Sequence, residues 1–137
     1  MKIKLIKNAQ MPKKGREGDA AWAVYLLDNC SIPANTGFCL DTGICLELDP
    51  GYAAIFVPRS STAKKGIFIS NCLIDSNYRG EIMVCLYNDS KEWQSVEYGD
   101  RIAQIVIIPY LQYDLNVVEE LDETDRGENG FGSSGNN

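Results

Sequence analysis

Ten residues near the middle of the chain, at positions 73–82, are the starting point for the fold: Leu-Ile-Asp-Ser-Asn-Tyr-Arg-Gly-Glu-Ile. The segment begins apolar, passes through the turn-forming run 75–77, and leads into a second β-rich run at 82–87. We therefore predict a β-hairpin with an acid, Asp75, and an aromatic, Tyr78, on one tight bend. Such a bend suits ligand recognition because its flanking strands hold it still. Asp, Ser and Asn are also common in turns without a ligand, so this segment alone does not establish a site.

Strand and turn signals alternate on both sides of this segment. Turns recur about every ten residues, a spacing typical of an all-β sandwich or barrel. The predicted strands are 2–6, 20–27, 38–40, 44–48, 52–57, 67–70, 82–87, 94–96 and 102–108, with 112–119 as a candidate last strand. A short helix is an alternative for the continuous apolar run 20–27, and 61–66 is the best candidate for a helix.

Composition separates a body from a tail. The 137 residues carry 45% hydrophobic and 23% charged side chains, as expected of one globular domain. From Glu119 onward the chain loses apolar residues and gains acid and glycine, so we expect a domain at 1–118 and a flexible tail at 119–137. The apolar run 102–110 is too short to span a bilayer, and 1–10 has no signal-peptide pattern. We therefore expect a cytoplasmic protein without a membrane partner.

Charge and residue usage exclude several classes of function. The net charge of −6 disfavours a broad nucleic-acid surface, so an anionic ligand needs local arginines or an accompanying divalent cation. The chain has no histidine, which excludes a Ser-His-Asp triad and the usual His-containing zinc site of nucleotide deaminases. Five cysteines, odd in number and without a C-x-x-C pair, are predicted to be buried, reduced thiols: Cys30, Cys39, Cys45, Cys72 and Cys85.

The remaining polar residues include the parts needed to cleave a phosphoanhydride with water. That reaction needs a base, donors for the phosphate oxygens, usually Mg²⁺, and a cover that excludes solvent. Asp75 is the candidate base, and Phe131 is a candidate cover. Candidate phosphate donors are Arg59, Ser60, Gln104, Arg126, Ser133 and Ser134.

Each of these residues also has an ordinary structural interpretation. Arg59 can be a surface cation, Gln104 can belong to a buried hydrogen-bond network, and Phe131 can lie in a tail that contacts nothing. We predict that Asp100 and Arg101 form a structural pair and that Glu81 is a solvated strand residue.

Four blocks of sequence, in order, resemble the trimeric dUTPase family. They are Pro-Arg-Ser-Ser-Thr-Ala at 58–63, the segment 73–82, Gly-Asp-Arg-Ile-Ala-Gln at 99–104, and Arg-Gly-Glu-Asn-Gly-Phe-Gly-Ser-Ser-Gly at 126–135. Each is weak alone, but the ordered set is specific. The resemblance implies a distorted jelly-roll β-barrel with at most one short helix, assembled as a homotrimer whose active sites use three subunits and are closed by the tail. It also implies hydrolysis of dUTP to dUMP and pyrophosphate, with Mg²⁺ bound to the triphosphate.

The resemblance also implies a role for individual residues. Asp75 is similar to the carboxylate that activates water, and Tyr78 to the platform that excludes a 2′-hydroxyl. The segment 71–74 resembles the uracil reader, and Phe131 the ring that stacks on the base. The full set of candidate substrate-binding residues is Arg59, Ser60, Ser61, Asn71, Cys72, Ile74, Tyr78, Gln104, Arg126, Phe131, Gly132, Ser133 and Ser134.

Three departures from the family pattern leave an alternative open. The family's first motif, Ala-Gly-Tyr-Asp-Leu, is matched by 20–24, where Ala23 replaces the acid that helps to hold the hydrated metal. Ser61 and Cys72 replace glycines. The phosphate donors and the base remain, so we expect hydrolysis with weaker use of metal. The alternative is a catalytically weakened nucleotide-binding or regulatory protein. A third possibility is a dCTP deaminase. The tail and the segment 73–78 follow the hydrolase pattern more closely than the deaminase pattern.

Overall fold

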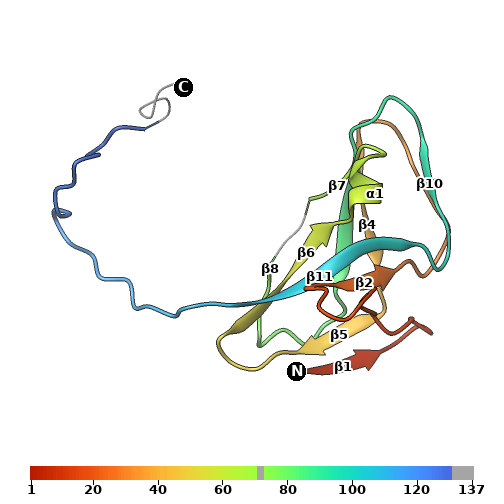
Figure 1. The fold of residues 1–137 in the computed structure, drawn as a ribbon, viewed down its shortest axis with the longest axis horizontal. Helices are drawn as coiled ribbons and strands as arrows, with labels where there is room; N and C mark the ends of the chain where they lie inside the picture. The colour runs from red at the N-terminus through yellow and green to blue at the C-terminus, as the bar shows by residue number, and fades with distance from the viewer. Residues whose placement is uncertain (71–72, 131–137) are drawn as a thin grey trace.

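The computed structural model describes residues 1–70 and 73–130, and Figure 1 shows the fold. Within this part of the chain there are eleven strands and one short helix. Their bounds are β1 Lys2–Leu5, β2 Trp22–Tyr25, β3 Cys30–Ile32, β4 Thr36–Asp41, β5 Ile44–Glu47, β6 Tyr52–Pro58, α1 Ser60–Ala63, β7 Ile67–Ile69, β8 Leu73–Ile74, β9 Met83–Asn88, β10 Gln94–Val96 and β11 Arg101–Pro109. None of the helical residues described here forms a segment long and apolar enough to cross a membrane.

The strands of the described residues form four antiparallel sheets around one core. The central sheet has the order β2-β11-β6-β8, and the second sheet has the order β4-β9-β7. Two smaller sheets pair β1 with β5 and β3 with β10. Val24, Leu86 and Ile105, from three different strands, are fully or almost fully buried in the same cluster. The prediction of a nearly all-β fold with one short helix is confirmed.

Alternation of side chains produces this core. In β9, Val84 and Leu86 point inward and are fully buried, whereas Met83 and Tyr87 point outward. Residues two apart on a strand lie on the same face, so a strand with this pattern covers the core on one side only. The predicted strands overlap the observed ones, apart from two short ones: β3, with the exposed Ser31 at its centre, and β8, which was predicted as part of a hairpin.

The candidate strand at 112–119 is not formed. Residues 110–130, which we call the C-terminal arm, contain no strand, and Figure 1 shows them leaving the end of β11 and running away from the body. Leu115 is 95% exposed and Val117 is 100% exposed. Their alternation with polar residues is typical of a strand, but a strand needs a neighbouring strand to pair with. The described part of this chain provides no such neighbour at the end of β11.

The prediction that all cysteines are reduced and buried is wrong for two of them. Cys39 and Cys85 form a disulfide, and they lie directly opposite each other on β4 and β9 with their Cα atoms 3.9 Å apart. The pattern of apolar neighbours suggested burial, but both residues lie on the outward face of the second sheet. Cys30 and Cys45 are half-buried free thiols, and burial raises the pKa of Cys30. Cys72 lies outside the described residues.

Candidate functional site

The segment that carries Asp75 connects two different sheets. β8 pairs with β6, whereas β9 pairs with β4 and β7, so the predicted β-hairpin is wrong. The apolar runs on both sides of the turn were placed correctly, but their pattern does not reveal which strand each run will pair with. We call residues 75–81 the Asp75 bend. It crosses from the edge of the central sheet to the middle strand of the second sheet.

Contacts within the Asp75 bend determine its shape. The Tyr78 N–H donates to the Asp75 carbonyl at 3.1 Å, which closes a β-turn. The Tyr78 hydroxyl donates to the Glu81 carbonyl at 3.0 Å, so the ring lies back across the bend. A Cβ at Gly80 would lie 2.6 Å from the Tyr78 ring carbon Cζ. Only glycine therefore leaves room for this position of the ring.

Asp75, Ile74 and Tyr78 come together as the sequence predicted. They line a cavity of about 320 Å³ whose other walls include Glu81 and Met83. Asp75 is exposed to solvent at the mouth of this cavity. A carboxylate held in this way can accept a proton from a bound water, and the apolar walls can contact an uncharged ring.

Glu81 is not the solvated residue that the sequence suggested. Its side chain is 18% exposed and both carboxylate oxygens have partners. Oε1 accepts from the Gly43 N–H at 2.8 Å, and Oε2 accepts from Lys7 Nζ at 2.7 Å. Lys7 also bonds Asp41. These partners lie far away in the sequence, so a local pattern does not predict them.

A second cavity, also of about 320 Å³, gathers positive charge beside α1. We call it the cationic pocket, and Arg59, Lys65 and Arg101 line it. The Arg59 guanidinium donates to the Arg101 carbonyl at 2.8 Å. Burial, and to a lesser extent the neighbouring Arg101 guanidinium, lowers the pKa of Arg59 below its ordinary value. Arginine nevertheless remains charged at neutral pH, so the pocket suits phosphate oxygens.

Hydroxyl groups add polar donors to the cationic pocket. Ser61 and Thr62 line it, whereas Ser60 is exposed at the start of α1. The Thr62 hydroxyl is buried and has no hydrogen-bond partner in the described part of the protein. A buried hydroxyl without a partner costs about 1–3 kcal/mol, which a ligand oxygen can offset.

Asp100 and Arg101 do not form the predicted pair. The described residues include no ion pair between them. Asp100 Oδ2 instead accepts from the Glu97 N–H at 3.1 Å and closes the turn before β11. Both residues line the cationic pocket, which lies beside the start of β11.

Gln104 and Ala23 occupy one row of the central sheet. Gln104 on β11 lies opposite Ala23 on β2 and Val57 on β6. Ala23 is 7% exposed, so position 23 offers a methyl group where the family pattern has an acid. Asp19 does not replace that acid, because its carboxylate accepts from the Arg16 N–H at 2.9 Å in its own turn. No group of three metal-ligating side chains was found among the described residues.

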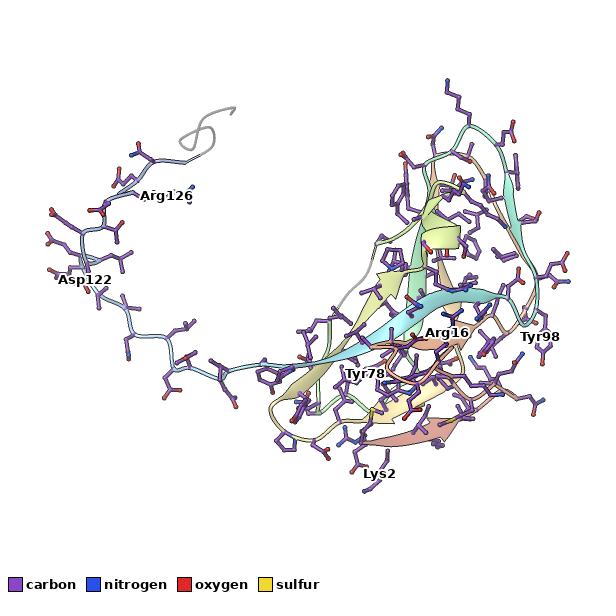
Figure 2. All side chains as sticks on the ribbon, viewed as in Figure 1. Lys2, Arg16, Tyr78, Tyr98, Asp122 and Arg126 are labelled. Atoms are coloured by element: carbon purple, nitrogen blue, oxygen red, sulfur yellow. A yellow bond between two sulfur atoms is a disulfide. The ribbon has the colours of Figure 1, made fainter. Side chains whose placement is uncertain are left out.

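The tail residues are only partly described. Arg126 lies on the C-terminal arm, where its Nε donates to the Asn129 carbonyl at 3.0 Å. Figure 2 shows Arg126 at the far end of the arm and Tyr78 on the body, so one chain does not bring them together. Six other candidates lie outside the described residues: Asn71, Cys72, Phe131, Gly132, Ser133 and Ser134.

The candidate base and the charged groups of the cationic pocket therefore lie in separate places within one chain. The cavity at the Asp75 bend and the cationic pocket share no lining residue. In Figures 1 and 2, which share one view, α1 and Tyr78 lie well apart on the body. Each pocket alone has only part of the chemistry for cleaving a nucleotide.

Comparison with known proteins decides the family. The family model described as dUTPase matches residues 7–135, which is nearly the whole chain. The chain belongs to the dUTPase family. Among curated dUTPases, the deoxyuridine 5'-triphosphate nucleotidohydrolase of Escherichia phage T5 is 39% identical, with 98% of each chain covered. The enzyme of the same name from Gamma-proteobacterium EBAC31A08 is 47% identical, with 80% of this chain and 81% of that protein covered.

Solved dUTPase structures share the fold. The dUTPase of Staphylococcus bacteriophage 80alpha with dUPNHPP has a TM-score of 0.88 at 28% identity, covering 98% of this chain and 97% of that one. A mutant dUTPase from phage phi11 of S. aureus, in which a structural Mg(II) ion is coordinated, has a TM-score of 0.78 at 21% identity, covering 87% and 96%. The all-β jelly-roll fold expected from the sequence is thus confirmed.

The structure adds residues that sequence reasoning missed. Lys65, Thr62 and Arg101 line the cationic pocket, and Lys7 reaches the Asp75 bend from the N-terminal segment. Lys65 was detectable, since it follows the block 58–63 by two residues, in the turn after α1. The contact of Lys7 had no sequence signal, because 74 residues separate it from Glu81.

Proposed function

We propose that this protein hydrolyses dUTP to dUMP and pyrophosphate, with Mg²⁺ carried on the triphosphate as part of the substrate. The observation that carries the proposal is the Asp75 bend, an exposed carboxylate beside a ring-sized cavity in a chain of the dUTPase family. The reaction breaks the anhydride between the α and β phosphoryl groups and adds one water. Asp75 accepts the proton of that water and is the catalytic residue.

The cavity at the Asp75 bend takes the nucleoside. Tyr78 lies under the deoxyribose, where its ring leaves no space for a 2′-hydroxyl. Ile74 contacts the base together with Asn71 and Cys72, whose backbone reads the uracil edge. The position of the Tyr78 ring, fixed through Glu81 and Gly80, supports this role because a rigid ring discriminates by shape.

The cationic pocket and its surroundings take the triphosphate. Arg59, Ser60, Ser61 and Gln104 donate to phosphate oxygens, as expected from the family resemblance. The charge of Lys65 and the unpartnered hydroxyl of Thr62 support an anionic ligand here. In the tail, Arg126 with Gly132, Ser133 and Ser134 holds the terminal phosphate, and Phe131 stacks on uracil.

We propose a homotrimer, which unites the two pockets across subunits. The outward face of the central sheet supports it, because Val57, Val106 and Ile55 form a half-buried apolar row beside Gln104. The outward face of the second sheet exposes three large apolar side chains, Phe68, Met83 and Tyr87. Exposed apolar faces of this kind mark protein interfaces. The alternating apolar residues of the C-terminal arm suit pairing with another subunit.

In this assembly residues 1–118 form the domain, whose arm segment 110–118 lies against another subunit, and residues 119–137 form the tail that closes over the active site. We further propose a cytoplasmic location, because a dUTP hydrolase acts on the nucleotide pool that supplies DNA synthesis. The acidic surface, with a net charge of −6, gives no support to a nucleic-acid partner.

Ala23 makes the metal dependence testable. Replacing Ala23 by Asp should lower the Mg²⁺ concentration that half-saturates dUTP hydrolysis by about tenfold, since an outer carboxylate typically contributes roughly ten- to a hundredfold to a metal site. The measurement is initial rate against Mg²⁺ at fixed dUTP. Ala23→Asn, of nearly the same shape but without charge, is the control. If the Ala23→Asp curve coincides with that of the parent, Ala23 is not the cause of a weaker use of Mg²⁺.

The proposed function is tested by pyrophosphate release from dUTP, dCTP, dTTP and UTP. Steady release from dUTP alone is the expected result. The second candidate, a nucleotide-binding or regulatory protein, is favoured by Ala23 in place of the acid, and predicts dUTP binding without release. Release of ammonia from dCTP would indicate a deaminase instead.

A further inference from the structure

The C-terminal end of the Asp75 bend, at Glu81 and Ile82, is hydrogen-bonded to the segment that joins β4 and β5. The Ile82 N–H donates to the Ile44 carbonyl at 2.8 Å, and the Thr42 hydroxyl donates to the Ile82 carbonyl at 2.6 Å. Glu81 adds a third attachment through the Gly43 N–H at 2.8 Å. The same Glu81 accepts the Tyr78 hydroxyl at its carbonyl. The position of the Tyr78 ring thus depends on where Glu81 is held.

The N-terminal segment closes over this attachment. The Ile6 N–H donates to the Gly43 carbonyl at 2.8 Å, and a Cβ at Gly43 would lie 2.6 Å from the Ala9 Cβ. This close packing is possible because Gly43 has no side chain. The loop that follows β1 therefore rests on the same backbone that holds Glu81.

Lys7 links this loop to the Asp75 bend. Lys7 and Asn8 have φ values of +53° and +56°, a left-handed conformation that is strained for residues other than glycine. In this conformation Lys7 Nζ reaches both Asp41 on β4 and Glu81, at 2.7 Å from Glu81 Oε2. The hydrogen bonds to these two carboxylates raise the pKa of Lys7, so it remains charged throughout the neutral range. Without this charge, the carboxylates of Asp41 and Glu81 would face each other at the C-terminal end of the bend.

We propose that Lys7 is a positioning residue for sugar discrimination: by neutralising Asp41 and Glu81 it holds Glu81, and through Glu81 the Tyr78 ring, in the place that rejects a 2′-hydroxyl. The inference rests on the proposed function, because it assumes that Tyr78 faces the deoxyribose. It adds a residue from the N-terminal segment that does not touch the substrate.

The test is Lys7→Met, measured as the ratio of kcat/KM for dUTP to kcat/KM for UTP. We expect the ratio to fall about fivefold, a loss in keeping with a partly exposed ion pair. Partial unfolding lowers the amount of active protein equally for both substrates, so it leaves this ratio unchanged. Lys7→Arg should restore most of the ratio. Lys4→Met, which removes the same charge from an exposed position on β1, should leave it at the parent value.

Binding of the non-hydrolysable imido analogues of dUTP and UTP, measured by calorimetry, separates the two proposals. If the parent binds the deoxy analogue preferentially but hydrolyses nothing, the proposed hydrolysis fails and the ratio of the two binding constants tests Lys7. An unchanged ratio in Lys7→Met, with the parent fully active, overturns the role of Lys7 alone. A parent that binds neither analogue overturns both.

Discussion

Replacing Asp75 by Asn should lower kcat for dUTP about 10³-fold, within the range of roughly 10² to 10⁴ that a positioned general base contributes. Asn has nearly the same shape as Asp but cannot accept a proton from water. Asp75 is exposed at the mouth of its cavity, so the substitution should leave the fold unchanged. KM should change much less than kcat, because the nucleoside and phosphate contacts remain. The measurement is steady-state pyrophosphate release at saturating dUTP.

Asp89→Asn is the matched control for this prediction. Like Asp75, Asp89 is an exposed aspartate, but it lies in the loop after β9, away from the Asp75 bend. Its replacement should leave kcat within about twofold of the parent, as expected for a surface change remote from the chemistry. If Asp75→Asn behaves like Asp89→Asn, Asp75 is not the base.

Ending the chain after Val118 should lower kcat/KM for dUTP by about a hundredfold or more, because the groups that orient the terminal phosphate and exclude water are then missing. The truncation removes Arg126 and Phe131 but keeps the apolar part of the C-terminal arm at 110–118. Assembly should therefore persist, which solution size measured by light scattering will check. Turnover close to that of the parent would contradict a closing tail.

A second variant tests the charge of Arg126 separately from closure of the active site by the tail. Arg126→Gln in the full-length chain removes only the cation, and should raise KM about tenfold through loss of one charge-assisted phosphate contact. Glu128→Gln, two residues away on the same exposed arm, is the control and should not weaken binding. Equal effects of the two substitutions would indicate a general property of the arm.

The strands were predictable from the sequence because alternation and turn residues are local properties. The partners of the strands were not. The apolar runs on each side of Asp75 suggested a hairpin, but β8 joins the central sheet and β9 joins the second sheet. The same limit explains Cys39 and Cys85, which are 46 residues apart and meet only because β4 and β9 are in register.

The candidate site was predictable where a residue type alone specifies chemistry. Asp75 and Arg59 were singled out as a base and as an anion contact, and each lines a cavity of the expected character. Lys7 and Glu81 were not recognised, because their importance comes from a contact between distant segments. Charged residues in turns and loops, such as these two, give no local sign of such a contact.

We propose that each active site combines Asp75 of one chain with the phosphate-binding and closing residues of other chains. This arrangement is tested by mixing equal amounts of two nearly inactive proteins, full-length Asp75→Asn and the chain ended after Val118, under conditions that exchange subunits. If base and tail come from different chains, random trimers should regain about a quarter of the parent activity, since roughly one site in four then has both. If mixed trimers verified by mass spectrometry recover no activity, base and tail do not come from different chains.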